Sequence, residues 1–472
     1  MQIEDITHEA AADFARGETS GTQLVRRDGR TLLIGRSGGA FTSGPLSLPF
    51  TATHLGLHWN VSGQADGLQV WARVSADGLK WSPWEALATE AIAQRGADSE
   101  VFAALLAAPE ARFAQYRIHF PADPAVAISR VAVTAINAAG RSGGVTPLPT
   151  VTLEAPGKSA TDKITLKVIT REAWGCNESQ LTTPRDVLWP EMYVPAKKVL
   201  LHHTATGDSY SDGAAEVRAV WAYHAITLGW GDIGYNALVD KYGNVYEGRH
   251  GRGEGSGREL LSADVVAGHC SSHNYGSTGV SAIGNYDRTK PSAALLTGID
   301  AMAAFECARH YLDPGKASDF LRSDDLWHPG LNNVSGHYES FNTSCPGKYL
   351  TAYLPKLRGH VATRLAFRGA PTFTQAPAGR NLAVGVPVSF SWNGMASYYC
   401  FEGWQRQADS ENITYLAGYA AWPGDDPLAQ RQVWLPVDTQ PISVTPSQPG
   451  HYTLHVRDGA GAYEANLTYL AT

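Results

Sequence analysis

Two stretches rich in glycine, proline, serine and threonine divide this chain into three parts. They cover residues 138–163 and 368–380, and such a composition is typical of linkers between folded domains. Domains usually hold about 100–200 residues, so a chain of 472 residues has room for three. We therefore predict domains over residues 1–140, 164–368 and 381–472, with linkers over residues 141–163 and 369–380.

The first and third parts alternate apolar and polar residues in short runs. Examples are residues 53–61 and 68–74 in the first part, and residues 386–392 and 451–457 in the third. A period of two is typical of half-buried antiparallel strands. Both flanks are therefore predicted to be all-β sandwich domains, the first similar to a jelly roll and the third to an immunoglobulin or fibronectin domain.

The middle part mixes strand-like and helical patterns. Apolar runs over residues 198–202 and 235–240 have the pattern of strands, whereas residues 212–226 have helical spacing. Ser292 is an N-cap candidate for a further helix. This alternation predicts a multidomain chain whose central domain is α/β, with a mixed sheet and flanking helices.

Composition argues against several classes of partner and location. The net charge is −7 and no block of lysines and arginines occurs, which disfavours nucleic acid as a partner. No stretch approaches the roughly 18–20 apolar residues that a membrane span requires. No signal peptide is visible at the amino terminus, so a secreted or cell-surface location would have to be inferred from the kind of substrate and not from a targeting segment.

Several histidines and one cysteine suggest a metal site, for which His202, His337 and Cys345 would suffice. His202 and His203 end an apolar run, and His337 precedes Cys345 by eight residues. Catalytic zinc takes three ligands from histidine, cysteine and carboxylates and leaves a fourth position open. Buried histidines are more often hydrogen-bonded core residues than ligands, so spacing alone leaves both interpretations open.

The remaining cysteines bear on redox state. If Cys345 binds metal, four of the five cysteines remain, an even number that is compatible with two disulfides in an oxidising compartment. These cysteines are Cys176, Cys270, Cys307 and Cys400. Their spacing does not assign the pairs.

Several short motifs occur in one order across about 200 residues of the middle part. They lie at residues 169–175, 201–206, 229–236, 243–249, 281–286, 336–337 and 343–347. In content and order they resemble the type 2 N-acetylmuramoyl-L-alanine amidases and the related peptidoglycan recognition proteins. The resemblance implies hydrolysis of the amide bond between the lactyl group of N-acetylmuramic acid and L-alanine in bacterial peptidoglycan, in cell-wall remodelling or lysis.

The resemblance also implies roles for individual residues. His202, His337 and Cys345 correspond to the ligands of one Zn²⁺ per chain, and His203 to a neighbour that does not bind metal. Tyr235 corresponds to the tyrosine of active members, and Thr343 to a position that can supply an oxyanion donor. Zinc so held polarises a carbonyl group and lowers the pKa of water, so no serine or cysteine nucleophile is required.

Substrate contacts are implied at four positions: Trp230, Arg249, His269 and Asn274. The Gly229-Trp230 pair resembles members that accept stems with meso-diaminopimelate, and Arg249 could meet a free carboxylate. Two other interpretations remain open, in which Trp230 packs in the core and Arg249 pairs with Glu247 or another acid. The tryptophans of the flanking parts fit either core packing or glycan binding; they are Trp59, Trp71, Trp81 and Trp84 in the first part and Trp392, Trp404, Trp422 and Trp434 in the third.

Two functions are therefore compatible with the sequence. The first is a zinc amidase, and the second is a recognition protein that binds peptidoglycan without cleaving it. Members of the family that only bind typically lose the cysteine ligand, so the intact set of His202, His337, Cys345 and Tyr235 favours catalysis.

Overall fold

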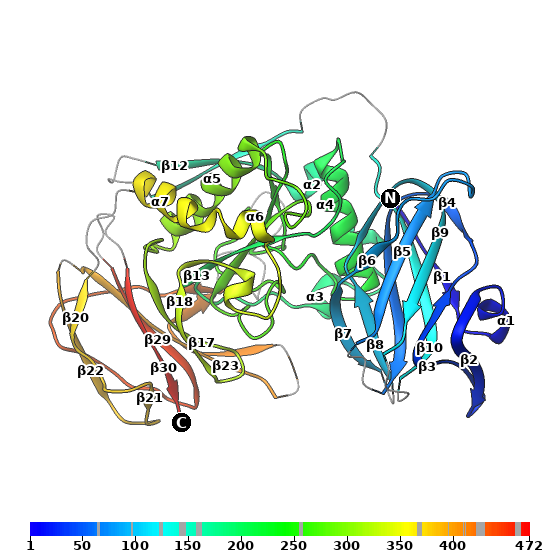
Figure 1. The fold of residues 1–472 in the computed structure, drawn as a ribbon. Helices are drawn as coiled ribbons and strands as arrows, with labels where there is room; N and C mark the ends of the chain where they lie inside the picture. The colour runs from blue at the N-terminus through cyan, green and yellow to red at the C-terminus, as the bar shows by residue number, and fades with distance from the viewer. Residues whose placement is uncertain are drawn as a thin grey trace. The chain divides into compact units, whose positions relative to one another are not determined.

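A computed structural model describes residues 1–63, 67–95, 98–121, 126–140, 148–156, 163–253, 258–365, 371–394, 396–408, 410, 412–421, 430–457 and 464–472 (Figure 1). The chain divides into two compact units. The first comprises Met1–Thr146 and Thr204–Trp230, and the second comprises Pro147–His203 and Gly231–Thr472. The three-domain division stays a prediction, and Trp422, most of the first expected linker and residues 369–370 of the second lie outside the described residues.

The first unit is built on one ten-stranded sheet. Its strands are β1 (Gln2–His8), β2 (Glu18–Arg27), β3 (Arg30–Thr42), β4 (Leu46–Ser62), β5 (Gln69–Ser75), β6 (Glu85–Leu87), β7 (Thr89–Arg95), β8 (Asp98–Ala103), β9 (Leu106–His119) and β10 (Ala127–Asn137), with the short helix α1 (Ala11–Phe14). All the pairings are antiparallel, as between β5 and β9 and between β4 and β10. On β4 the alternating pattern turns Leu55, Leu57 and Trp59 toward the apolar core, and the residues between them on the opposite face, His54, Gly56 and His58, are buried as well.

A helix from the middle of the sequence completes the first unit. Helix α4 (Gly213–Ala222) begins at Asp212, whose side chain accepts from the Ala215 amide, and continues into the π-helical turn η2 (Tyr223–Thr227). Glu216 on α4 lies 3.0 Å from Nε2 of the buried His54 on β4. A Cβ at Gly56 would approach the Tyr223 ring to 2.4 Å, so the close contact between helix and strand requires glycine there.

The second unit contains a seven-stranded mixed sheet, which confirms the α/β prediction for the middle part. Its order is β11 (Val151–Pro156), β12 (Lys163–Ile169), β15 (Val245–Glu247), β14 (Ala237–Val239), β16 (Ser277–Ala282), β13 (Lys198–His203) and β19 (Val334–Gly336). Strands β16, β13 and β19 run parallel, whereas β11 pairs antiparallel with β12. Residues 151–156, expected in a linker, are therefore an edge strand.

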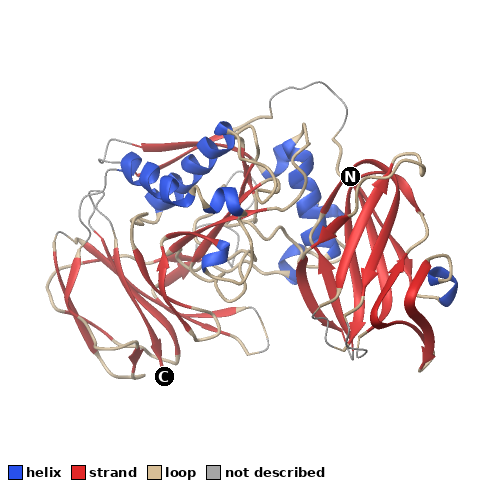
Figure 2. Ribbon diagram, viewed as in Figure 1, coloured by secondary structure: helices blue, strands red, loops and turns tan. Residues whose placement is uncertain are grey.

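Helices pack on this sheet (Figure 2). The long helix α5 (Ala293–Arg309) shares one apolar core with the sheet and with α7 (Leu354–Leu365). Ser292 caps α5 as predicted, because its hydroxyl accepts from the Leu295 amide at 3.0 Å. Shorter elements are α2 (Arg171–Trp174), η1 (Glu178–Gln180), α3 (Arg185–Leu188), the hairpin β17 (Ala317–Leu321) and β18 (Trp327–Asn332), η4 (His337–Glu339) and α6 (Lys348–Thr351).

The carboxy-terminal strands belong to the same compact unit. They are β20 (Thr372–Gln375), β21 (Asn381–Leu382), β22 (Val388–Asn393), β23 (Tyr398–Arg406), β24 (Ile413–Ala417), β25 (Tyr419–Ala421), β26 (Gln430–Gln432), β27 (Leu435–Pro436), β28 (Ile442–Val444), β29 (Gly450–Arg457) and β30 (Ala465–Ala471). Two of their sheets share a core around Phe390 and Tyr452. Trp404 stacks on Tyr275, with ring centroids 5.2 Å apart, and so joins these strands to the rest of the unit.

The cysteines differ from the disulfide expectation, because all five are free thiols. Cys307 lies inside α5 and Cys400 inside β23, where each is buried among core residues. Burial raises the pKa of Cys270 to about 11 and also raises the pKa of Cys307. Such thiols are poor nucleophiles.

Within the described part of the chain, no helix combines the length and the apolar character that crossing a bilayer requires.

Candidate metal centre

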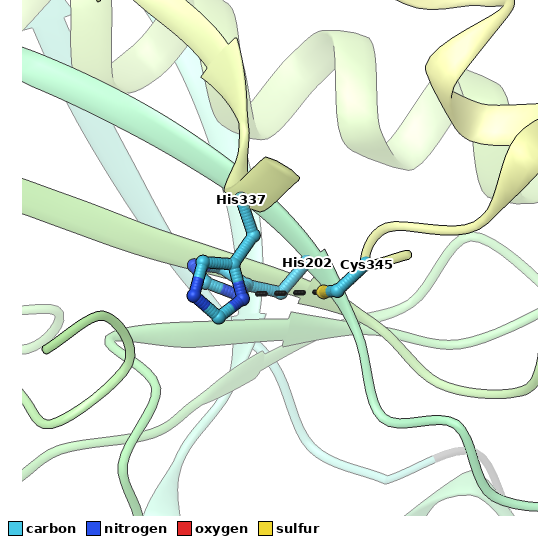
Figure 3. Close-up of side chains that lie close together, drawn as sticks. All are labelled: His202, His337 and Cys345. Carbon is cyan, nitrogen blue, oxygen red and sulfur yellow. Dashed lines mark hydrogen bonds between the residues drawn. The ribbon is translucent and has the colours of Figure 1, made fainter. Parts of the chain in front are cut away.

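Two neighbouring parallel strands bring the two histidines together. His202 lies at the end of β13, and His337 follows the end of β19. These strands pair in register, with Leu201 opposite Gly336. Cys345 lies in the loop before α6, and one ligand atom from each of the three residues lies within 4.8 Å of the others (Figure 3).

The three side chains suit a metal ion. His202 directs Nδ1 toward Cys345 Sγ at 3.6 Å, and its ring lies 4.5 Å from that of His337. The Nε2 atom of His337 is buried and has no hydrogen-bond partner among the described residues. Buried polar atoms normally have partners, and a metal ion would supply one here. Two imidazoles and a thiolate are ligands that zinc prefers.

The pKa values favour the metal-binding form of the histidines. Burial, followed by the proximity of His337 and His269, lowers the pKa of His202 well below its usual range. Burial likewise lowers the pKa of His337 to about 4. Both rings are therefore neutral near pH 7, as metal ligands must be.

His203 is held outside this cluster. Its Nδ1 atom accepts from the Tyr286 amide at 3.2 Å. Its own backbone amide donates to Cys345 Sγ at 3.4 Å, a contact that stabilises a thiolate. The second histidine of the pair thus supports the cysteine through its backbone.

A chain of hydrogen bonds continues behind His202. The Nε2 atom of His202 lies 3.0 Å from Nδ1 of His269, and Nε2 of His269 lies 3.3 Å from the Ser277 hydroxyl. Ser277 in turn donates to the His273 carbonyl at 2.5 Å. With His202 presenting Nδ1 to the cluster, its Nε2–H donates to His269, and this fixes the tautomer and orientation of the ring. The structure thus places His269, expected at the substrate, beside a metal-ligand candidate.

Tyr235 lies close to the cluster. Its ring centroid is 5.6 Å from that of His202, and the residue is buried just before β14. The Arg249 amide donates to the Tyr235 carbonyl at 2.8 Å. This hydrogen bond joins the loop of Tyr235 to the segment that follows β15. The tyrosine side chain is therefore held within reach of groups bound beside His202.

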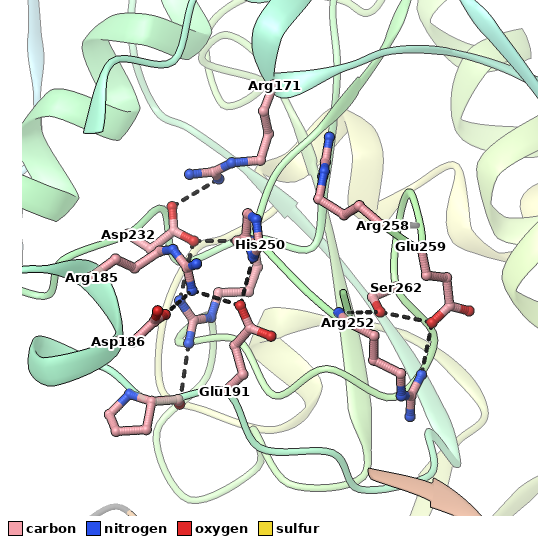
Figure 4. A network of polar contacts seen from close by, with 12 residues as sticks. Arg171, Arg185, Asp186, Glu191, Asp232, His250, Arg252, Arg258, Glu259 and Ser262 are labelled. Carbon is pink, nitrogen blue, oxygen red and sulfur yellow. Dashed lines mark hydrogen bonds and ion pairs between the residues drawn. The ribbon is translucent and has the colours of Figure 1, made fainter. Parts of the chain in front are cut away.

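A buried ion network fixes the loop that carries Tyr235 (Figure 4). Asp232 accepts from Nη1 of Arg171 at 2.9 Å and from Nη1 of Arg249 at 3.1 Å. It also accepts from the amides of Ile233 and His250. Burial alone would raise the pKa of Asp232, but the two arginines hold it well below its usual range. Sequence reasoning missed this residue, because nothing in the local pattern distinguishes it from a solvent-exposed acid.

The Arg249 side chain has its partners inside the protein, unlike the predicted receptor for a free carboxylate of the substrate. The residue is 1% exposed, and its guanidinium pairs with Asp232. The remaining contacts go to the carbonyls of Trp189, Pro190 and Val266, while the group lies 4.0 Å from the Trp189 ring centroid. The structure therefore supports the alternative of an internal ion pair, with Asp232 in place of Glu247.

The other predicted contacts have local roles that the structure describes. The half-buried Thr343 accepts from the Cys345 amide at 3.2 Å and so shapes the ligand loop. Asn274 accepts from the Cys270 amide at 2.8 Å. Trp230 belongs to the first compact unit, where its ring lies 4.9 Å from that of His224. Their roles in catalysis or substrate binding stay predictions.

Comparison with known proteins locates the similarity in the middle of the chain. Residues 192–348 match the family model described as N-acetylmuramoyl-L-alanine amidase. Peptidoglycan-recognition protein SC1a/b of Drosophila simulans is 30% identical over 155 residues, which cover 32% of this chain and 68% of that protein. The N-acetylmuramoyl-L-alanine amidase of Homo sapiens is 30% identical over 164 residues, which cover 34% of this chain and 24% of that protein.

Another insect protein and a solved structure are also similar to the middle of the chain. Peptidoglycan-recognition protein SC2 of Drosophila melanogaster is 30% identical over 151 residues, covering 31% of this chain and 66% of that protein. Among solved structures, Drosophila PGRP-LB matches at 23% identity with a TM-score of 0.29, over 40% of this chain and 91% of that one.

The mixed sheet and the largely buried His-His-Cys cluster at its edge define an α/β domain with a candidate metal centre. The chain belongs to the family of N-acetylmuramoyl-L-alanine amidases and peptidoglycan recognition proteins.

Proposed function

We propose that this protein is a zinc-dependent amidase that hydrolyses the bond between the lactyl group of N-acetylmuramic acid and L-alanine in peptidoglycan. One observation carries the proposal: His202, His337 and Cys345 converge within 4.8 Å, and the Tyr235 ring lies 5.6 Å from that of His202. The human relative that bears the name of this activity adds support.

His202, His337 and Cys345 would hold one zinc ion per chain. When bound, zinc supplies Lewis-acid chemistry, polarising a carbonyl and lowering the pKa of water. The His203 amide stabilises the Cys345 thiolate, and His269 keeps the His202 ring in place. These contacts preorganise the ligands before substrate arrives.

Tyr235 and Thr343 are the proposed catalytic residues. The Tyr235 phenol would donate a hydrogen bond to oxygen as it gains negative charge. Thr343 accepts from the Cys345 amide, which leaves its hydroxyl proton to donate in the same way.

The substrate and its location follow from the reaction. The partner is bacterial peptidoglycan, reached outside the cell, so the protein would be secreted or held at a cell surface. Gly229 and Trp230 support a preference for stems with meso-diaminopimelate. Asn274 would contact the substrate. His269 would instead orient His202, and Arg249 would pair with Asp232 inside the protein.

The alternative is a recognition protein that binds peptidoglycan without cleaving it. Release of L-alanine amino termini from purified peptidoglycan separates the two functions. Amino termini that appear with the wild-type protein and disappear after chelation support an amidase. Binding without new amino termini, with zinc present, would establish recognition alone.

A further inference from the structure

The outer face of strands β5 and β9 carries a row of tryptophans and arginines. Strand β5 contributes Trp71 and Arg73, and β9 contributes Arg117, which lies opposite Trp71. Their sequence neighbours face the core, so Val70, Ala72, Tyr116 and Ile118 are all buried. The half-buried Trp81 and Trp84 follow β5 and complete what we call the Trp–Arg row: Trp71, Arg73, Trp81, Trp84 and Arg117.

Cations and aromatic rings alternate along this row. The Arg73 guanidinium carbon lies 4.8 Å from the Trp81 ring centroid and 4.5 Å from that of Trp84. The Arg117 guanidinium carbon lies 4.3 Å from the Trp84 ring centroid. Such contacts hold both guanidiniums over rigid aromatic rings.

The positive charge of the row is not neutralised by an ion pair. Arg73 donates through Nε and Nη2 to Gln115, and Arg117 donates through Nε to Thr42. No carboxylate of the described residues lies within ion-pair distance of either group. Burial and then the positive charge of Arg117 lower the pKa of Arg73, while the negative charge of Glu18 raises it by a smaller amount. Two cations therefore lie together beside aromatic rings, an arrangement that an anion would relieve.

We propose that the Trp–Arg row binds peptidoglycan glycan strands from which the stem peptides have been removed. The inference rests on the proposed function, because amide hydrolysis creates this ligand. Water adds across the lactyl–alanine bond, the C–N bond breaks, and the products are a lactyl carboxylate and an ammonium group on the released stem. Each cleaved muramic acid thus gains one negative charge and loses the peptide that would obstruct contact with a flat surface.

The chemistry of this product matches the row. Carboxylates bind guanidinium groups through paired, charge-assisted hydrogen bonds. The apolar faces of sugar rings can pack on tryptophan, which offers a rigid aromatic surface. The first unit would then hold the enzyme on strands that it has already stripped. A row that serves only to stabilise the sheet predicts no such binding.

The test measures the dissociation constant of the full-length protein for stem-free strands prepared with an unrelated amidase. The same strands with their lactyl carboxylates converted to methylamides provide the matched ligand. We expect the methylamide strands to bind at least tenfold more weakly. Equal affinity for the two ligands would overturn the proposal. This comparison uses the wild-type protein and requires no variant.

Variants locate the site. Arg73→Gln and Arg117→Gln should each weaken binding of stem-free strands at least tenfold, whereas Arg112→Gln, an exposed arginine on β9 outside the row, should leave it unchanged. Wild-type affinity in both row variants would overturn the assignment. Because the strands are made independently, binding without amidase activity would refute the proposed function alone, and cleavage without binding would refute this inference alone.

Discussion

The Nε2 atom of His202 lies 3.0 Å from the Nδ1 atom of His269. On the other side of the ring, His202 Nδ1 faces Cys345 Sγ. The contact therefore gives Nε2 of His202 a protein partner and leaves Nδ1 on the side where the proposed metal would bind. Contacts of this kind set both the direction and the basicity of a metal-binding imidazole.

Replacement of His269 should weaken zinc binding without removing a ligand. We expect His269→Ala to raise the zinc dissociation constant about 10- to 100-fold, because His202 loses the acceptor that orients it. Competition with a chromogenic chelator measures this change. His360→Gln, at a largely exposed histidine on α7, should bind zinc like the wild type, and equal affinity in both variants would contradict the role of His269.

Tyr235 should affect turnover more than metal binding. Tyr235→Phe keeps the ring beside His202 but removes the hydroxyl, so we expect full zinc content and a fall in kcat of at least about 100-fold. Steady-state release of amino termini and metal analysis of the same samples provide the measurement. Unchanged kcat would exclude the phenol from catalysis.

Asp232 should be critical for stability. Asp232→Asn leaves Arg171 and Arg249 buried without their shared counter-charge, and breaking a buried pair in this way typically costs about 3–5 kcal/mol. Denaturant unfolding measures the loss. The exposed pair of Lys163 and Glu154 is the control, because Lys163→Ala should cost less than about 1 kcal/mol. Similar losses in the two variants would contradict this account of the network.

The carboxy-terminal strands should lose stability at alkaline pH. Burial lowers the pKa of His455, but Glu464 and Glu402 outweigh it and raise the pKa to about 9. Folding therefore favours protonated His455. Its contribution to the free energy of unfolding is complete below about pH 6.5 and is lost as pH rises through about 9. We expect His455→Gln to abolish much of the decline in unfolding free energy between pH 6.5 and 9.5. An identical decline in wild type and variant would contradict the role of His455.

The sequence predicted the three metal-ligand candidates better than it predicted the segments that connect the domains. The ends of apolar strands and a recurring order of motifs indicated His202, His337 and Cys345, and the structure brings these three together. Strand β11 was missed because its glycine- and proline-rich surroundings have the composition of a linker, although Leu153 and Ala155 pack against the core.

Long-range partners explain the other differences. Sequence alone did not show that Asp232 would be buried beside Arg249, and so Arg249 remained a candidate for binding substrate. The packing of α4 with the amino-terminal strands likewise depends on His54 and Glu216, which are 162 residues apart. An even number of cysteines is compatible with disulfides, but the fold buries Cys307 and Cys400 in separate elements as free thiols.

The central claim is that Cys345 belongs to a zinc centre that cleaves peptidoglycan. The most direct test measures bound zinc and release of L-alanine amino termini together, in the wild type, Cys345→Ala and Cys307→Ala, where Cys307 is a buried thiol outside the cluster. We predict one zinc per chain and activity in the wild type and Cys307→Ala, and loss of both in Cys345→Ala. Full zinc content and unchanged release of amino termini in Cys345→Ala would contradict the account.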